Sequence, residues 1–505
     1  MQIIKSGMIV SFFTLISRIF GYIRDILMAS YLGLHFDAFA VAFRLPNTFR
    51  SLFAEGAFSA AFVPMFSSKM STGSRDDALK FAAQVFSLLF LILVVFVGFM
   101  LVFMPHIVPL LAPGFIKQSD KLSLTITLSY FTTPYLFFIA LASLYAGVMN
   151  SCGKFAIAAA LPIILNLVMI LAIKFLSPFA KSPSHALAYG VFIAGISQFA
   201  VIAYAVHRAS IHIGFTKIML TDDLKAMFKN MIPAIIGSGV VQINLAIDTI
   251  IASFIDGAAS IIYMADRLNQ FPLAIIGTAL GTVLLPTLSR QIRERNFDAA
   301  ILTQNKALEL ALFFTLPCAF ALGAISDTLV SFLFERGEFS AQDRYKVAST
   351  LTALAFGLPA FVMIKIFTPR YFAEYDTTTP VKISAVCIAA NIVFSISLIQ
   401  VFSYVGIAMA TSISAWINVS LLYYFQQKRK LFSVDKKLPI YVIKVVFSCV
   451  LMIFVLILFE RLEIMGTSYL YKLLIFISEL LLGIVTYFAS SYFLKTLNFN
   501  WRRAN

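Results

Sequence analysis

The stretch from Ser17 to Pro64 reads SRIFGYIRDILMASYLGLHFDAFAVAFRLPNTFRSLFAEGAFSAAFVP. It is as apolar as the segments around it, yet it carries charged side chains of both signs. They are Arg18, Arg24, Arg44, Arg50, Asp25, Asp37 and Glu55. A charged side chain at the centre of a bilayer costs roughly 2.5–3.5 kcal/mol on insertion scales. If this stretch crosses a membrane, its charges must therefore face a hydrated cavity or a polar partner.

Two interpretations of these charges remain open. In the first, each arginine pairs with an acid and only fastens helices together. In the second, the arginines, which outnumber the nearby acids, bind an anion supplied from outside. We favour the second, because a surplus of buried positive charge needs a negative partner.

The composition predicts an all-α polytopic membrane protein. Of 505 residues, 60% are hydrophobic and only 12% are charged, whereas a soluble domain carries about 25% charged residues. The apolar runs are continuous, unlike the alternating pattern of a membrane barrel. The net charge of +15 lies mostly in short loops and does not indicate nucleic-acid binding. No cleaved signal peptide is expected, because no small-x-small site follows the first apolar run.

No motif indicates an enzyme or a cofactor. The four cysteines are scattered through apolar segments, so neither a zinc site nor a disulfide framework is expected. The sequence has no Walker A loop, no H-E-x-x-H and no G-x-S-x-G.

A spanning helix needs about 20 mostly apolar residues, and fourteen segments meet this requirement. They lie near 7–31, 36–66, 79–104, 122–148, 155–177, 186–206, 228–255, 262–288, 307–334, 346–367, 381–402, 404–426, 438–459 and 470–494. Residues 383–427 hold no Asp, Glu, Lys or Arg and are too long for one span, so a turn is expected at 403–406.

The distribution of Lys and Arg predicts the orientation. With the N-terminus inside, 25 of these residues fall on the inner face and nine on the outer face, and five arginines remain within helices. Because inner loops are enriched in Lys and Arg, both termini are expected in the cytoplasm.

The chain also repeats itself at a shift of 223 residues. DILMASYL at 25–32 aligns with DTIIASFI at 248–255, and Arg44-Leu45 aligns with Arg267-Leu268. Six spans per copy is an even number, so both copies run the same way through the membrane. Parallel repeats with a site between the halves are a transporter architecture. The predicted organisation is an N-lobe at 1–210, a C-lobe at 211–428, and two extra helices with a basic linker and tail at 429–505.

Helical spacing gives the candidate site residues. Arg18 and Asp25 fall on one face of the first helix, as do Arg44 and Glu55 on the second. Arginine suits an anion site, because its planar fork binds phosphate oxygens bidentately. Asp248, alone in the seventh span, is either an ion or proton ligand or the partner of an arginine. For Asp376, a loop-turn role is favoured over an ion ligand.

The segments SRIFGYIRD, DAFAVAFRLPNTFRSLFAEGAFSAAFVP, YMADRLNQFPLAIIGTALGTVLLP and DTTTPVKI strongly resemble the MurJ (MviN) family. These are lipid II flippases of the bacterial inner membrane, within the multidrug/oligosaccharidyl-lipid/polysaccharide exporter superfamily. The resemblance covers the whole chain. It implies transport of undecaprenyl-diphosphate-linked disaccharide-pentapeptide to the periplasmic leaflet for peptidoglycan synthesis, by alternating access through a cationic cavity.

The resemblance also implies site residues. The substrate-binding set is Arg18, Arg24, Asp37, Arg44, Arg50, Glu55 and Arg267, and the ion-binding candidates for Na⁺ or H⁺ coupling are Asp248 and Asp376. Membrane lipids and other cell-wall synthesis proteins are the remaining expected partners. The alternatives are another exporter of the superfamily, carrying a lipid-linked oligosaccharide or a drug, and a scaffold that binds the lipid precursor without transporting it.

Overall fold

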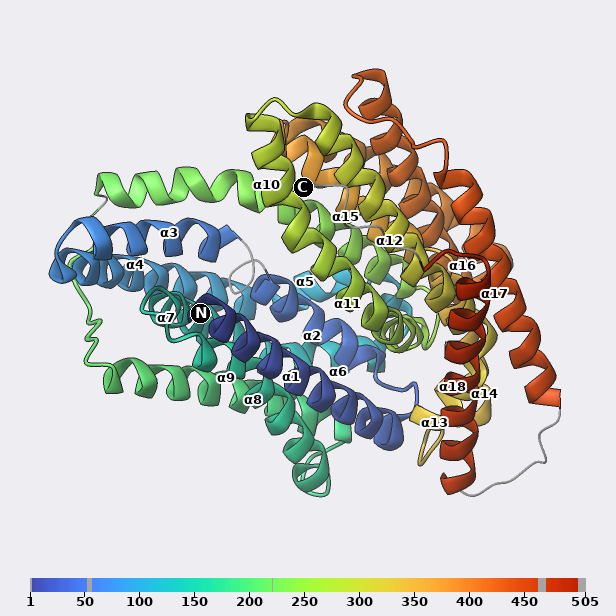
Figure 1. The fold of residues 1–505 in the computed structure, drawn as a ribbon. Helices are drawn as coiled ribbons and strands as arrows, with labels where there is room; N and C mark the ends of the chain where they lie inside the picture. The colour runs from blue at the N-terminus through green and yellow to red at the C-terminus, as the bar shows by residue number, and fades with distance from the viewer. Residues whose placement is uncertain (1, 52–56, 220, 462–468, 498–505) are drawn as a thin grey trace. The chain divides into compact units, whose positions relative to one another are not determined.

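The structure is a computed structural model that describes residues 2–51, 57–219, 221–461 and 469–497. Within these ranges the chain is helical, with no strand (Figure 1). The prediction of an all-helical chain is therefore confirmed for the described residues.

The chain forms two compact units, Met1–Ser260 and Ile261–Asn505. The first holds α1 (Gln2–Leu32), α2 (Asp37–Arg50), α3 (Ala57–Thr72), α4 (Arg75–Val102), α5 (Met104–Leu111), η2 (Pro113–Lys117), α6 (Ser119–Thr132), α7 (Tyr135–Ser151), α8 (Phe155–Leu171), η3 (Ala172–Leu176), α9 (Pro183–Arg208) and α10 (Asp222–Ala252). Here α1 packs along α8, α2 against α6, and α10 against α3. The repeat instead assigns the residues of α10 to the second copy, so the lobe boundaries at 210 and 428 stay a prediction.

Helix α11 (Ala258–Arg293) begins at the end of the first unit and continues into the second. The remaining helices are α12 (Phe297–Ala324), α13 (Ser326–Phe334), α14 (Ala341–Ala355), α15 (Leu358–Ala373), α16 (Thr378–Lys428), α17 (Leu438–Arg461) and α18 (Tyr469–Phe493). Helix α12 packs against α15 and α17, and α17 packs against α18. The helix α14 begins with a capping box, in which Ser340 and Asp343 each bind the other's backbone N–H.

In the part of the chain that the structure describes, nine helical stretches are long and apolar enough to cross a membrane. Ten of the fourteen predicted spans overlap these stretches, although the span at 307–334 continues past Ala324 and across the break at Ile325. The other four, 7–31, 36–66, 228–255 and 262–288, coincide with α1, α2 with α3, α10 and α11. Of the ionisable residues singled out in the sequence, all but Glu55 and Asp376 lie in these helices. Within α10, the described apolar stretch runs only from Gln242 to Ala252.

The predicted turn at 403–406 is confirmed, although it lies inside the single element α16, Thr378–Lys428. Ser403 has φ 50° and ψ −133°, which breaks the helix. A Cβ on Gly406 would lie 2.5 Å from the Leu398 carbonyl carbon, and the Ser414 hydroxyl donates to the Cys387 carbonyl at 2.8 Å. Residues 27 positions apart in a straight helix would be about 40 Å apart. The chain therefore reverses at Ser403, and α16 is two antiparallel helices.

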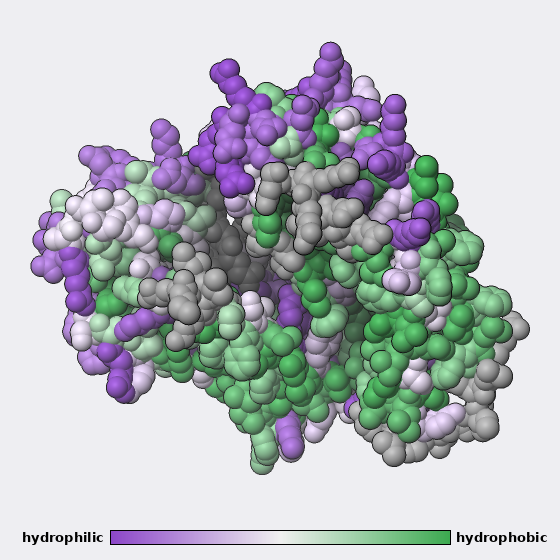
Figure 2. Space-filling view, viewed as in Figure 1, coloured by the Kyte–Doolittle hydropathy of each residue, from purple (hydrophilic) through white to green (hydrophobic). Residues whose placement is uncertain are grey.

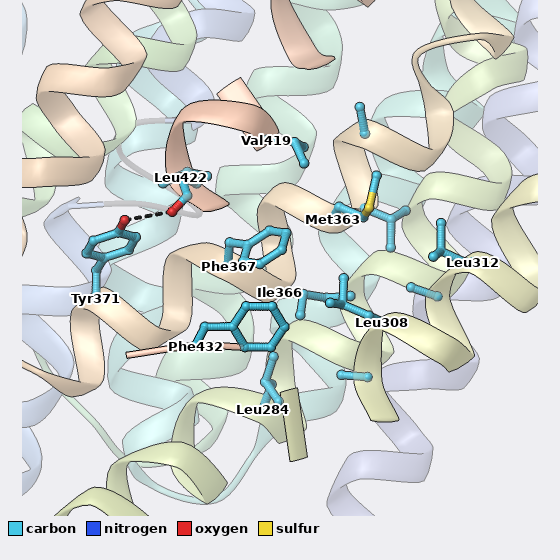
Figure 3. Packing of buried hydrophobic residues seen from close by; sticks show 14 of the residues in the cluster. Leu284, Leu308, Leu312, Met363, Ile366, Phe367, Tyr371, Val419, Leu422 and Phe432 are labelled. Carbon is cyan, nitrogen blue, oxygen red and sulfur yellow. Dashed lines mark hydrogen bonds between the residues drawn. The ribbon is translucent and has the colours of Figure 1, made fainter. Parts of the chain in front are cut away.

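A continuous apolar core holds the second unit together (Figure 3). Leu284 of α11, Leu308 of α12, Ile366 of α15 and Leu422 of α16 all belong to it. Phe432, in the linker after α16, is 2% exposed and packs into the same core. This anchors the start of the linker to the folded unit.

Apolar side chains also cover much of the surface, as the green areas over α17 and α18 in Figure 2 show. On α17, Ile443 and Phe447 are 67% and 59% exposed, and on α18 Val485 is 62% exposed. Such contiguous apolar surface is typical of helices that face lipid.

Candidate functional site

The candidate residues are carried by a few helices. Arg18 and Arg24 lie on α1, Asp37, Arg44 and Arg50 on α2, and Asp248 on α10, all in the first unit. Arg267, on α11, is half-buried in the second unit, and Asp376 lies in the turn between α15 and α16 of that unit. Glu55 lies outside the described residues.

Arg24 is the most buried of the candidate arginines with described contacts, at 5% exposure. Its Nε and Nη2 donate to Asp25 Oδ1 at 2.9 and 2.6 Å. Its Nη1 donates to Asn166 Oδ1 at 2.9 Å, and the Asn166 amide donates to the Ser17 carbonyl at 3.0 Å. Because Asn166 belongs to α8, this network fastens α1 to α8. For Arg24 the geometry is that of the first interpretation, an arginine paired with an acid.

Arg18 differs from Arg24. Its side chain is half-buried, and among the described residues it makes neither a hydrogen bond nor an ion pair. Six residues separate Arg18 from Arg24 on α1, which places the two side chains about 120° apart around the helix. Arg18 is therefore the candidate arginine whose guanidinium is available for an anionic ligand.

On α2, Arg44 and Arg50 are both half-buried. Arg44 Nη2 donates to the Leu245 carbonyl on α10 at 2.9 Å, and Arg50 Nε donates to Asn47 Oδ1, one turn earlier, at 3.0 Å. Pro46 lies within α2 between them. A proline removes one backbone donor of the helix and bends it, so Pro46 can change the direction of α2 between the two arginines.

Asp37, the first residue of α2, is 2% exposed and accepts four hydrogen bonds. Its Oδ1 accepts from the Ser260 backbone N–H at 2.8 Å and from the Ser260 hydroxyl at 2.7 Å. Its Oδ2 accepts from the Gly257 N–H at 2.7 Å and from Lys121 Nζ at 2.9 Å. Lys121 also pairs with Asp256. We call Asp37, Lys121, Gly257 and Ser260 the Asp37 clamp.

The clamp joins two equivalent turns of the predicted repeat. Asp37 and Ser260 are 223 residues apart, which is the shift that aligns Asp25 with Asp248. Asp37 follows the α1–α2 turn, and its carboxylate binds the N–H groups at the start of α11. A helix N-terminus favours negative charge. Sequence reasoning selected Asp37 but missed its partners, since no sequence pattern linked Lys121 to it.

Asp248 is 8% exposed on α10. The Asn244 amide, one turn earlier, approaches its Oδ2 at 3.4 Å. The Leu245 carbonyl that Arg44 binds is also within one turn of Asp248 on the same helix. No group of three or more His, Cys, Asp or Glu side chains that could hold a metal ion occurs among the residues that the structure describes.

Asp376 caps α16. Its Oδ1 accepts from the backbone N–H groups of Thr378 and Thr379, and its Oδ2 accepts from Arg429 at 2.6 Å and from the Thr379 hydroxyl at 2.6 Å. Burial alone would raise the pKa of Asp376, but the hydrogen bonds from Thr379 and Arg429 outweigh it and lower the pKa to about 2. These contacts match the loop-turn role favoured in the sequence.

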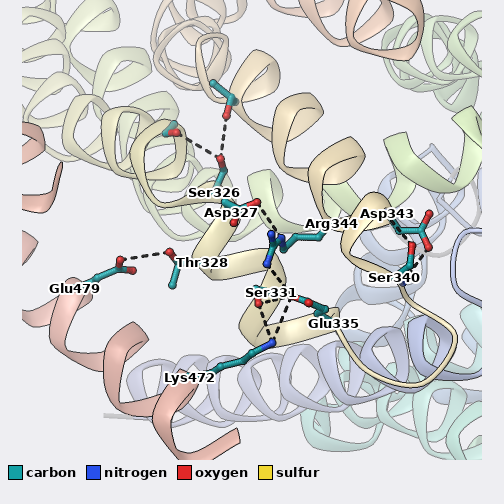
Figure 4. A network of polar contacts seen from close by, with 12 residues as sticks. Ser326, Asp327, Thr328, Ser331, Glu335, Ser340, Asp343, Arg344, Lys472 and Glu479 are labelled. Atoms are coloured by element: carbon teal, nitrogen blue, oxygen red, sulfur yellow. Dashed lines mark hydrogen bonds and ion pairs between the residues drawn. The ribbon is translucent and has the colours of Figure 1, made fainter. Parts of the chain in front are cut away.

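A second polar network, shown in Figure 4, links α18 to α13 and to the turn that follows it, and the sequence did not indicate it. Glu335 accepts from Arg344 at 3.1 Å and pairs with Lys472 of α18 at 3.4 Å. Burial opposes ionisation of Glu335, yet Ser331, Arg344 and Lys472 together lower its pKa. Deeper along α18, Glu479 is 2% exposed and accepts from the Thr328 hydroxyl at 3.3 Å.

The first unit also contains a cavity of about 320 Å³. Its lining includes Ile9 of α1, Met149 of α7 and Lys154 at the start of α8. Ile9 precedes Arg18 by nine residues, or about 13 Å along α1. The cavity is therefore separate from the candidate arginines.

Comparisons with known proteins agree with the resemblance. The family model described as lipid II flippase MurJ matches residues 28–479. A probable lipid II flippase MurJ of Rickettsia prowazekii is 37% identical over 505 residues, covering 99% of both chains. A probable lipid II flippase MurJ of Rhizobium meliloti is 41% identical over 429 residues, covering 84% of this chain and 80% of the relative.

The solved structures that resemble this chain include a member of the same family. A lipid II flippase MurJ in an inward closed conformation superposes with a TM-score of 0.81 at 28% identity, covering 97% of this chain and 99% of that one. An inward-facing multidrug resistance MATE family transporter superposes with a TM-score of 0.69 at 12% identity, and this likeness shows a shared fold alone. The chain belongs to the lipid II flippase MurJ family.

Proposed function

We propose that this protein moves lipid II from the cytoplasmic to the periplasmic leaflet of the bacterial inner membrane. The observation that carries the proposal is the match to one probable lipid II flippase MurJ, at 37% identity over 99% of both chains. The charge of the candidate residues fits this substrate, because lipid II carries a diphosphate and five of the seven substrate-binding candidates are arginines. An exporter of cationic drugs would need the opposite sign.

The diphosphate is bound by the arginines whose guanidinium groups can reach it. Arg18 is the first of these, and Arg44, Arg50 and Arg267 are half-buried on helices that hold few other charges. Arg24 acts differently, since its bonds to Asp25 and Asn166 fix the orientation of α1. Glu55 completes the set that the family resemblance implies. The polyprenyl tail remains in lipid, against the apolar surface of the extra helices α17 and α18.

The chain crosses the membrane fourteen times, with both termini in the cytoplasm. Supporting this count are the nine apolar stretches, the reversal within α16, and the four charged segments in α1, α2 with α3, α10 and α11. The bond between Asp37 and Ser260 supports the two parallel six-helix repeats, because residues beside a two-fold axis contact their own counterparts.

Transport proceeds by alternating access, and the Asp37 clamp closes the periplasmic side. In the proposed orientation the α1–α2 turn and the α10–α11 turn both face the periplasm. The clamp holds these turns together, so it must break before the site opens outward. Na⁺ or H⁺ binding at Asp248 biases the same equilibrium, since a ligand shifts it only through unequal affinity for the two states.

Genetic rescue tests the proposal. The gene is expressed in bacterial cells depleted of their own lipid II flippase, with protein levels checked by immunoblot. We expect growth and normal cell shape to return. Normal levels of membrane-inserted protein without rescue would contradict the proposed function, and would leave the precursor-binding scaffold as the better account.

A further inference from the structure

A lysine within the second unit has no role in the site described above. Lys365 lies inside α15 and within the candidate span Ala341–Ala373. Its neighbours Val362 and Ile366 are fully buried in the apolar core, whereas Lys365 is half-buried and faces elsewhere. A lysine inside a spanning segment is costly and marks a functional position by default. The sequence assigned Lys365 only to the inner-face charges.

Helix α11 provides the space for this side chain at Gly277. A Cβ on Gly277 would lie 2.9 Å from Lys365 Cδ, 3.3 Å from Cε and 3.1 Å from Nζ. The lysine stem and its ammonium group therefore lie directly against the backbone of α11 at Gly277. A residue with a side chain at this position would collide with them.

Gly281 shows that this is not ordinary helix packing. Gly277 and Gly281 form a G-x-x-x-G pattern, which usually lets two helices approach closely at both glycines. A Cβ on Gly281, however, would meet none of the described residues within 4 Å. Only Gly277 is covered, and a charged side chain covers it.

The same helix carries Arg267. Ten residues separate Arg267 from Gly277, which is about 15 Å along the helix axis. Since α11 begins at the periplasmic turn in the proposed orientation, Lys365 contacts it nearer the cytoplasmic end than Arg267. A substrate that enters from the cytoplasmic leaflet meets the lysine first.

Building on the proposed function, we propose that Lys365 is a further substrate-binding cation, which captures the diphosphate of the lipid on the cytoplasmic side, and that Gly277 is its positioning residue. Lysine suits capture, because its compact ammonium binds phosphate as a point charge from many directions. Arg267, with its planar fork, then holds the headgroup deeper in the protein.

Four full-length proteins test this inference: wild type, Lys365→Met, Gly277→Ala and Gly281→Ala. Lys365→Met removes the charge and keeps a similar stem, and Gly277→Ala displaces the ammonium without removing it. Gly281→Ala is the matched control, because the same atom is added to open space. Alanine favours helix more than glycine does, so neither glycine variant should lower the thermal unfolding temperature.

The measurements are lipid II binding to purified protein and the initial rate of lipid II flipping in vesicles at several lipid II densities. We expect Lys365→Met and Gly277→Ala to bind about tenfold more weakly, the effect of losing one charge-assisted contact, and Gly281→Ala to match wild type. The apparent KM should rise while the maximal rate changes little. The Lys365→Met defect should shrink at high ionic strength, because salt screens the lost attraction.

Wild-type affinity and KM in both Lys365→Met and Gly277→Ala would overturn the inference. So would a lowered unfolding temperature with unchanged affinity of the folded fraction, since Lys365 would then be structural. Absence of flipping by the wild-type protein would instead contradict the proposed function, so the two failures are distinguishable.

Discussion

The most specific prediction concerns the Asp37 clamp. Asp37→Asn keeps the size of the side chain but replaces one acceptor oxygen with an NH₂ group. That group would face donors that now bind the carboxylate, among them the Gly257 N–H and the Lys121 ammonium. The variant therefore loses the ion pair and leaves at least one donor without an acceptor.

The magnitude follows from the burial of the two partners. Removing one member of a fully buried ion pair costs about 3–5 kcal/mol. Asp37 is 2% exposed but Lys121 is 21% exposed, so solvent screening reduces the cost to about 2 kcal/mol. A difference of this size changes an equilibrium constant roughly 30-fold. The clamped state should lose about that much population relative to an outward-open state.

Hydrogen–deuterium exchange over the segment 254–262 measures this directly, because Gly257 and Ser260 donate their backbone N–H groups to Asp37. In Asp37→Asn the exchange of these amides should accelerate by one to two orders of magnitude. Ser260→Ala is the control, since it removes only the hydroxyl contact and should have a smaller effect. Equal protection in Asp37→Asn and wild type would refute the clamp as a closure.

Three further outcomes follow from the contacts. Arg24→Gln should destabilise the protein by about 3 kcal/mol, because it leaves Asp25, which is 0% exposed, without the guanidinium; thermal unfolding measures this, with Arg18→Gln as the milder control. The stabilisation from ionised Asp376 is complete above its unfolded pKa near 3.8 and is lost only as pH falls through about 2. Unfolding of Arg429→Gln and wild type should therefore differ by the same amount from pH 5 to pH 8. Ser403→Val should lower stability by about 1–2 kcal/mol, because a β-branched residue resists positive φ, whereas Ser403→Gly should be tolerated.

The fold class was predictable because membrane helices are long, apolar and nearly free of charge. The turn at Ser403 was predictable from length alone, since 45 uncharged residues exceed one bilayer span. The breaks at Ile325 and Gly357 were missed, although Asp327 and Pro359 each lie two residues beyond them, because each break falls inside an apolar run that was counted as one span.

The site was only partly predictable. Periodicity placed Asp25 on the face of Arg18, whereas the structure pairs it with the adjacent Arg24. An arginine side chain is long enough to curl back to the next residue, so helical spacing alone cannot assign the pair. The contacts of Asp37 with Lys121 and Gly257 depend on tertiary packing between distant segments. The contact between Lys365 and Gly277 likewise joins distant segments and required the structure.

Lipid II translocation by the purified protein in sealed vesicles tests the central claim most directly. Vesicles with wild-type protein, with Arg18→Gln and with no protein are compared for the initial rate at which labelled lipid II reaches the opposite leaflet. The account predicts rapid translocation by wild type and a severe loss in Arg18→Gln, whose guanidinium has no described protein partner. A wild-type rate equal to that of protein-free vesicles would contradict it.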